Sequence, residues 1–146
     1  MPGIVVGVDG SPNSHRALEW AAQEAAVRQV PLTVLTVHVV PATIWGHNPE
    51  RYPQDADLEQ KAQAKVQELA DQTIAALTGA KPESVTVRSI SGTPAEELIN
   101  ASSGADLVVV GSRGHGGFAE LLMGSVSSQV THHAHCPVVI VPEAGA

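Results

Sequence analysis

Short apolar runs alternate along this chain with longer segments in which apolar residues recur every three or four positions. Four runs rich in β-branched residues predict strands over residues 4–8, 32–39, 107–110 and 138–141. The first and the last two are continuously apolar, which is typical of strands covered on both faces. Residues 85–90 alternate apolar and polar side chains, which predicts a fifth strand at the edge of the sheet.

The segments between these runs have helical periodicity. One helical face lies within residues 18–25, a second within 58–77, and a fourth helix is expected from about Ser125 to Ala134. Strands that alternate with helices indicate right-handed βαβ units. We therefore expect one α/β domain over residues 1–146, an open five-stranded parallel sheet with helices on both faces, Rossmann-like.

Local signals mark the third helix and one long connection. Thr93 can cap this helix, Pro94 suits its first turn, Glu96 would complete a capping box, and Gly104 can end it. The connection from Pro41 to Asp55 is rich in proline and long for a compact domain. Such loops are often functional.

A glycine-rich stretch follows the fourth predicted strand. Four glycines fall within residues 111–117, where a side chain would block a tight turn or the approach of a ligand to the backbone. Further on, Gly124 and Ser125 open the fourth helix, whose free amides and dipole form an anion site. The hydroxyls of Ser125 and Ser127 add donors for phosphate, and Arg113 is the only cation in the stretch.

The end of the first strand favours a ligand site over a simple connection, which glycines alone would equally allow. It reads Asp9-Gly10-Ser11, and Ser11 can cap a helix that begins at Pro12. If strands one and four are neighbours, Asp9 and Gly111 face each other at the switch point where open α/β sheets hold ligands. Asp9 could accept hydrogen bonds from ribose hydroxyls, or it could bond to the amides of its own turn.

Together these features resemble the universal stress protein family along nearly the whole chain. The family's ATP-binding members carry Gly, two residues, Gly, nine residues, Gly and then Ser or Thr; the matching positions are Gly111, Gly114, Gly124 and Ser125. The opening Ile-Val-Val-Gly-Val-Asp-Gly-Ser and the closing His-Cys-Pro-Val-Val-Ile-Val-Pro also resemble the two ends of this family. The resemblance implies a single universal stress protein domain with the sheet order 3-2-1-4-5.

The resemblance also implies an ATP site with named contacts. Asp9 would contact the ribose, Gly111 would lie against it, and Val39 would meet adenine through its backbone. Residues around the phosphates would be Arg113, Gly114, Gly124, Ser125, Val126 and Ser127, while Gly10 and Ser11 complete the site beside the ribose. Mg²⁺ would accompany ATP, because Arg113 alone offsets the triphosphate charge.

Oligomeric state and regulation follow from the same resemblance. Members commonly form homodimers by pairing their last strands, here Val138 to Val141, an apolar edge that would otherwise invite aggregation. We expect a regulatory protein in which ATP orders the segment from Gly111 to Met123 and changes the surface offered to a protein partner. An intact glycine spacing disfavours the alternative of a dimeric stress protein without nucleotide binding.

Charge and composition exclude other partners. The net charge is −7 and the eight basic residues are scattered, which argues against binding to nucleic acid or to an anionic membrane. No apolar stretch approaches the roughly 20 residues that span a bilayer, and the first residues do not resemble a signal peptide. A lone Cys136 fits a reducing compartment, so a soluble, cytoplasmic protein is expected.

Three other kinds of site fit this sequence less well than ATP binding. Residues 114–119 fit the dinucleotide fingerprint, but no acidic residue stands about 20 positions on, which disfavours a dehydrogenase. A Walker loop is excluded because no Gly-Lys-Ser or Gly-Lys-Thr occurs. The cluster His132, His133, His135 and Cys136 is too tightly spaced to converge on one metal ion, so a structural role is preferred.

Catalysis on ATP is the remaining alternative. An ATPase or phosphotransferase needs a base beside the phosphates, and the stretch contains no lysine and no well-supported base, although His115 is a candidate. Asp9 is already assigned to the ribose. We therefore expect turnover to be absent or slow.

Overall fold

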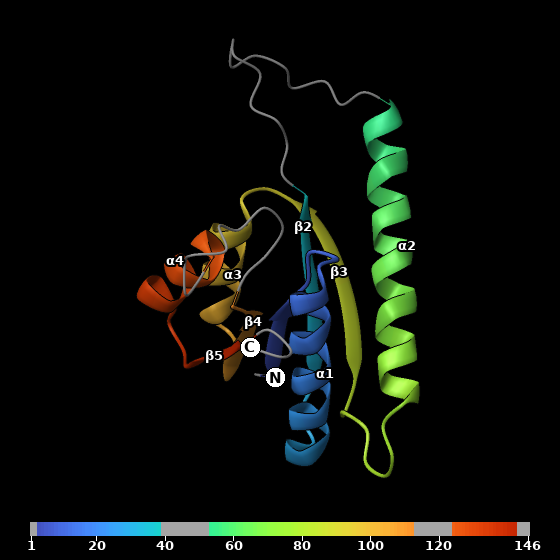
Figure 1. Cartoon of the computed structure of the whole chain (residues 1–146), viewed down its shortest axis with the longest axis vertical. Coiled ribbons are helices and arrows are strands. Elements are labelled where there is room, and N and C mark those ends of the chain that lie inside the picture. The colour runs from blue at the N-terminus through green and yellow to red at the C-terminus, as the bar shows by residue number, and fades with distance from the viewer. Residues whose placement is uncertain (1–2, 39–52, 113–123, 143–146) are drawn as a thin grey trace.

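The computed structural model of the protein describes residues 3–38, 53–112 and 124–142. Strands and helices alternate along the chain as β1 (Ile4–Gly7), α1 (Pro12–Arg28), β2 (Leu32–His38), α2 (Pro53–Ala75), β3 (Val85–Ser91), α3 (Pro94–Ser102), β4 (Leu107–Gly111), α4 (Ser125–His133) and β5 (Val138–Val141). The strands form one parallel sheet in the order β3-β2-β1-β4-β5 (Figure 1). The predicted fold class and sheet order are confirmed.

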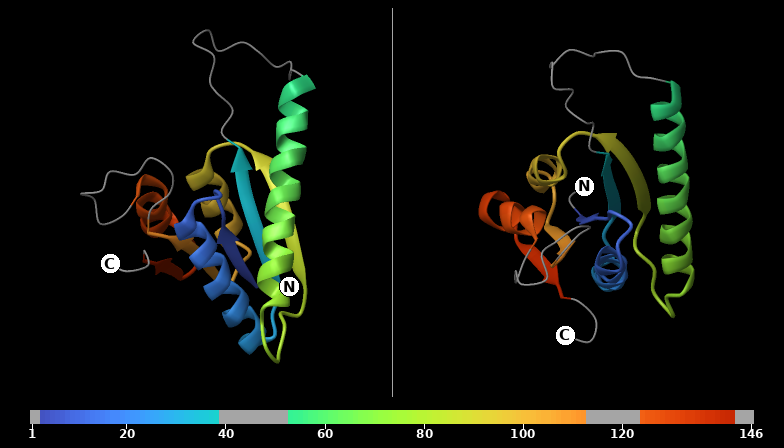
Figure 2. Two further views of the ribbon diagram at one scale, coloured as in Figure 1. Left: turned by 45° about the vertical axis from the view of Figure 1, so that its right-hand side comes forward. Right: turned by 45° about the horizontal axis from the view of Figure 1, so that its top comes forward.

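Helices cover both faces of this sheet, α1 and α2 on one side and α3 and α4 on the other (Figure 2). Alternate residues of β1 supply the two layers: Ile4 and Val6 pack with α1, while Val5 packs with α3. Because both layers remove apolar surface from water, β1 and β4 need the continuous apolar runs seen in the sequence. None of the described helices combines the length and apolar character that a membrane crossing requires.

The two edge strands differ from each other. β3 lies at the edge of the sheet as predicted, and half-buried residues alternate with exposed ones in its first half, residues 85–88. The continuous run of β5 predicted cover on both faces, but Val138, Val139 and Ile140 are only half-buried. The reason is position: among the described strands β5 pairs with β4 alone, so it lies at the rim of both helical layers.

Two local predictions around the helices are wrong. Thr93 stands at the cap position of α3, but its exposed side chain makes no capping hydrogen bond among the described residues, so no capping box forms with Glu96. The predicted loop from Pro41 to Asp55 is also too long, since α2 already begins at Pro53. A proline is tolerated there because the first turn of a helix does not use its amide hydrogen.

Candidate functional site

The carboxyl ends of β1 and β4 lie side by side, because Val5 pairs with Val108 and Val6 with Val109. From this point β1 leads into α1 on one face of the sheet, and β4 leads toward α4 on the other (Figure 2). Such a reversal of connections is where open α/β sheets hold ligands. The neighbouring arrangement that the sequence analysis required of strands one and four is confirmed.

A tight turn after β1 presents Asp9. Its Oδ1 accepts a hydrogen bond from the backbone N–H of Ser11 at 2.9 Å, and Gly10 between them has a φ of +85°, a conformation that favours glycine. This is the turn bond that the sequence analysis gave as one of two roles for Asp9. A carboxylate offers about four acceptor sites, so an exposed Asp9 bonded to its own turn can still take part in binding.

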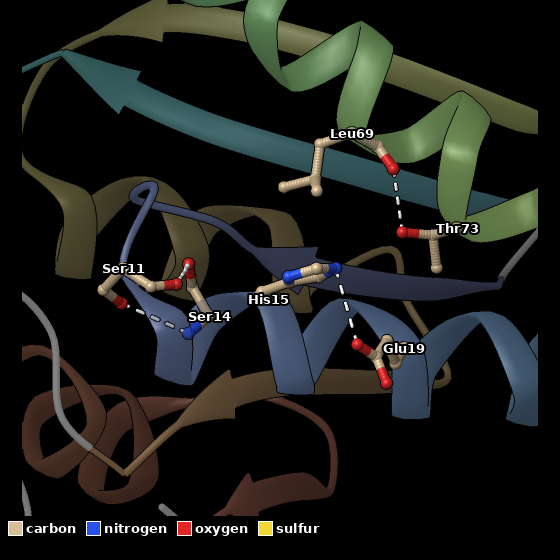
Figure 3. Close-up of polar contacts among 6 residues, drawn as sticks. All are labelled: Ser11, Ser14, His15, Glu19, Leu69 and Thr73. Atoms are coloured by element: carbon tan, nitrogen blue, oxygen red, sulfur yellow. Dashed lines mark hydrogen bonds and ion pairs between the residues drawn. The ribbon is translucent and has the colours of Figure 1, made fainter.

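Ser14 is a member of this turn that sequence reasoning missed. It is buried, and its Oγ accepts from the N–H of Asp9 at 3.2 Å and donates to the carbonyl of Ser11 at 3.0 Å. In return Ser11 caps α1, as predicted, by accepting from the N–H of Ser14 at 3.2 Å (Figure 3). These bonds fix the direction in which the strand ends and the helix begins.

Gly111 at the end of β4 faces the first turn of α1. A Cβ placed on Gly111 would lie 3.1 Å from the carbonyl oxygen and the Cβ of Asn13, closer than side chains normally approach. A side chain at this position would therefore require the first turn of α1 to shift by a few tenths of an ångström. Asn13 is itself buried and was not singled out from the sequence.

The start of α4 is anchored to the end of β4. The carbonyl of Ser112 accepts hydrogen bonds from the N–H of Gly124 at 2.6 Å and from the hydroxyl of Ser127 at 3.1 Å. Gly124 is the residue before α4, and Ser125 at the first helical position is exposed. The first amides of a helix have no partner within it, so the start of α4, bonded to Ser112 just after β4, carries donors that the helix itself does not use.

Three of the predicted site residues, Val39, Arg113 and Gly114, lie outside the described residues. The point where the chain leaves β2 toward Val39 is nevertheless defined. His38 Nε2 lies 2.6 Å from the hydroxyl of Ser89, and the carbonyl of His38 accepts from the N–H of Gly92 at 2.9 Å. Both contacts fasten the end of β2 to β3.

The histidines at the end of α4 do not converge. The rings of His132 and His133 lie 6.4 Å apart, and Nδ1 of His132 is 2.7 Å from the carbonyl of Ser128. In the part of the chain that the structure describes, no group of three or more His, Cys, Asp or Glu residues could hold a metal ion. Cys136, interpreted from the sequence as buried, is only partly so because it precedes the edge strand β5.

A hollow lies between α1 and α2, away from the ends of β1 and β4. It has a volume of about 270 Å³ and its walls include His15, Glu19 and Thr73. Nε2 of His15 is 3.4 Å from Oε1 of Glu19, and the Thr73 hydroxyl donates to the carbonyl of Leu69 (Figure 3). The Glu19 carboxylate on the wall would repel a phosphate, so this hollow is unsuited to that group.

Comparison with known sequences agrees on one family. The sequence profile of the universal stress protein family matches residues 2–142. A universal stress protein of Mycobacterium tuberculosis is 38% identical over 155 aligned residues, which cover 97% of this chain and 48% of the relative. One of Mycolicibacterium smegmatis is 36% identical over 141 residues, covering 95% and 47%. The chain thus spans about half the length of the curated relatives that it matches.

Solved structures of the same family share the fold. UspA from Lactobacillus plantarum matches with a TM-score of 0.79 at 24% identity, over 96% of this chain and 97% of that chain. A universal stress protein solved in complex with cAMP gives 0.67 at 26% identity, over 97% and 96%. The universal stress protein of Archaeoglobus fulgidus, solved in complex with dAMP, gives 0.61 at 25% identity, over 97% and 98%.

Proposed function

This chain belongs to the universal stress protein family, and we propose that it binds ATP with Mg²⁺ where β1 and β4 end, as a regulatory protein rather than a fast enzyme. One observation carries the proposal. The Asp9 turn and the exposed start of α4 follow two neighbouring parallel strands at a reversal of chain connections. An acceptor for ribose hydroxyls and a set of donors for phosphate therefore share one edge of the sheet.

The phosphate end of this site is the start of α4. The amides of Ser125, Val126 and Ser127 have no partner within the helix, and the helix dipole adds roughly half a positive charge at this end. The Ser125 hydroxyl is exposed and available as a further donor. Arg113 and Gly114 would also contact the phosphates; this part of the proposal rests on the glycine motif.

The nucleoside end is the turn after β1 together with the end of β2. Asp9 accepts from the ribose hydroxyls, with Gly10 and Ser11 forming the turn that presents its carboxylate. Adenine meets the backbone at Val39, the residue that follows the fastened His38. Gly111 lies at the back of this site, where it also packs against α1.

Solved relatives with bound nucleotides support a nucleotide site in this chain, and the glycine motif is the reason for proposing ATP as the ligand. The two solved relatives were determined with cAMP and dAMP, which share adenine, a pentose and one phosphate. The triphosphate is inferred here from the spacing of Gly111, Gly114 and Gly124. Mg²⁺ would arrive with the phosphates, since it is typically held by one or two carboxylates and by substrate oxygens; no described group of side chains forms a cage for it.

Regulation would act through a second copy and a protein partner. Among the described strands β5 (Val138–Val141) pairs with β4 alone, so its other edge and its three half-buried residues could pair with a second copy in a homodimer. We place the protein in the cytoplasm, on the sequence argument from charge and the lone Cys136. ATP would bind at the start of α4, the helix that precedes β5 in the chain. Binding there would change the surface that α4 offers to a protein partner.

Calorimetry with ATP and Mg²⁺ tests the proposal. Wild-type protein should release or absorb heat on binding, and Gly124→Val should abolish that heat because the side chain blocks the start of α4. Gly104→Ala is the matched control, because a Cβ there meets nothing within 4 Å. Absence of binding by the wild type at millimolar ATP would refute the proposal, and turnover faster than about 1 per second would instead indicate an enzyme.

A further inference from the structure

Ser127 makes two contacts that do not depend on any ligand. Its side chain is 3% exposed, and its Oγ lies 3.1 Å from the carbonyl oxygens of both Ser112 and Gly124. A serine hydroxyl has one proton to donate, and both neighbours are acceptors only. The proton is therefore shared between two backbone carbonyls, and none is left to offer to a phosphate.

Ser112 is the fixed point of this arrangement. Its carbonyl accepts from the hydroxyl of Ser127 and from the N–H of Gly124, which uses both lone pairs of one oxygen. Its own N–H donates to the carbonyl of Val141 on β5 at 2.9 Å. The sheet thus holds Ser112, and Ser112 holds the start of α4.

We propose that Ser127 is a positioning residue that joins the two ends of the glycine-rich segment, Ser112 and Gly124, before any nucleotide binds. This assigns the buried hydroxyl a role different from the phosphate contact expected from the sequence. The consequence for binding rests on the proposed function: the α4 amides lie at a set distance from Asp9 because Ser112 and Ser127 register the helix against the sheet. The phosphate donors are then ready in the free protein, which lowers the cost of ordering them on binding.

Hydrogen exchange in the nucleotide-free protein tests the link itself. Ser127→Ala removes the hydroxyl that bonds to Ser112 and leaves the Gly124 N–H as the remaining bond between that carbonyl and the start of α4. The amide of Gly124 should then exchange roughly tenfold faster. Ser127→Thr should keep exchange slow, because threonine retains the hydroxyl that bonds to the carbonyls of Ser112 and Gly124. Ser128→Ala is the control, since that position lies about 100° round the helix; equal exchange in Ser127→Ala and Ser128→Ala overturns the proposal.

Calorimetry separates positioning from direct contact. Positioning requires that Ser127→Ala weakens ATP binding about tenfold while adenosine binds as to the wild type, since adenosine has no phosphate to reach α4. If ATP binding weakens but Gly124 exchange stays slow, Ser127 contacts phosphate directly and the proposal is wrong. If the wild type binds no ATP, the proposed function fails, and the exchange measurement still decides whether Ser127 joins the two ends.

Discussion

Gly111 at the end of β4 packs directly against Asn13 in the first turn of α1. The 3.1 Å that would separate a Gly111 Cβ from the carbonyl oxygen of Asn13 leaves no room for an ordinary contact. Asn13 follows the turn that presents Asp9, so Gly111 lies close to both strand ends that form the candidate site. Stability and binding are thus linked at one glycine.

Gly111→Ala should destabilise the protein by about 1–3 kcal/mol, because the backbone of α1 must move to admit the methyl group. Urea unfolding monitored by circular dichroism measures this. Gly104→Ala should change the free energy of unfolding little, since a Cβ at Gly104 meets open space. Equal effects of the two substitutions would contradict the packing argument.

Asp9→Ala should weaken ATP binding by about 1.5–3 kcal/mol, the range for a hydrogen bond to a charged group. It should also lower the free energy of unfolding of the nucleotide-free protein, because the N–H of Ser11 loses its acceptor. Asp9→Asn keeps an oxygen for that N–H and should recover most of the stability but not all of the affinity.

Calorimetry measures the affinity for ATP, and urea unfolding measures the stability. Asp71→Ala, on an exposed position of α2, is the control and should alter neither ATP binding nor the Asp9 turn. Unchanged affinity in Asp9→Ala would remove Asp9 from the ribose.

Ser102→Ala should cost about 1–3 kcal/mol of stability. The buried Ser102 hydroxyl donates to the carbonyl of Ile99 at 2.5 Å and accepts from the N–H of His135 at 2.9 Å, so it ties α3 to the segment before β5. Its removal leaves that N–H without this partner. Thermal unfolding checks the cost, and Ser103→Ala at the neighbouring exposed position serves as control. A loss of the same size in both variants would mean that the His135 bond is not its source.

The thiol of Cys136 should be slow to alkylate. Burial raises the pKa of Cys136 and the Asp106 carboxylate raises it further, against an opposing hydrogen bond from the Val108 backbone. Because the thiolate is the reactive form, iodoacetamide should modify the folded protein more slowly than the urea-unfolded chain. Asp106→Asn should speed the reaction in the folded protein; no acceleration would remove the carboxylate as a cause.

The same raised pKa makes stability depend on pH. A folded pKa above the unfolded value contributes stability that is fully present below the unfolded pKa, about 8.5 for a free thiol, and is lost as pH rises through the folded value. The free energy of unfolding should therefore fall across this alkaline window. Cys136→Ser should remove that part of the dependence, and an identical pH profile in wild type and variant would contradict it.

Local pattern was enough to locate the strands and helices, because burial on a sheet or helix face imposes its period directly on the sequence. The local pattern did not predict exposure where it depends on position in the sheet, as at Val138 to Ile140. It also did not predict that the exposed hydroxyl of Thr93 makes no capping bond to α3. The predicted loop overlaps the start of α2 at Pro53 for a related reason. A proline signals both a loop and a first helical turn, and neighbouring residues do not separate the two.

The sequence by itself determined the parallel α/β architecture and the residue types that follow each strand, because hydrophobic period and glycine spacing are local properties of the chain. Only the tertiary structure decided what those residues touch. Gly111 packs against Asn13, and the Ser127 hydroxyl donates to the carbonyl of Ser112. These partners belong to different elements, and their contacts exist only once α1 and α4 are packed on the sheet.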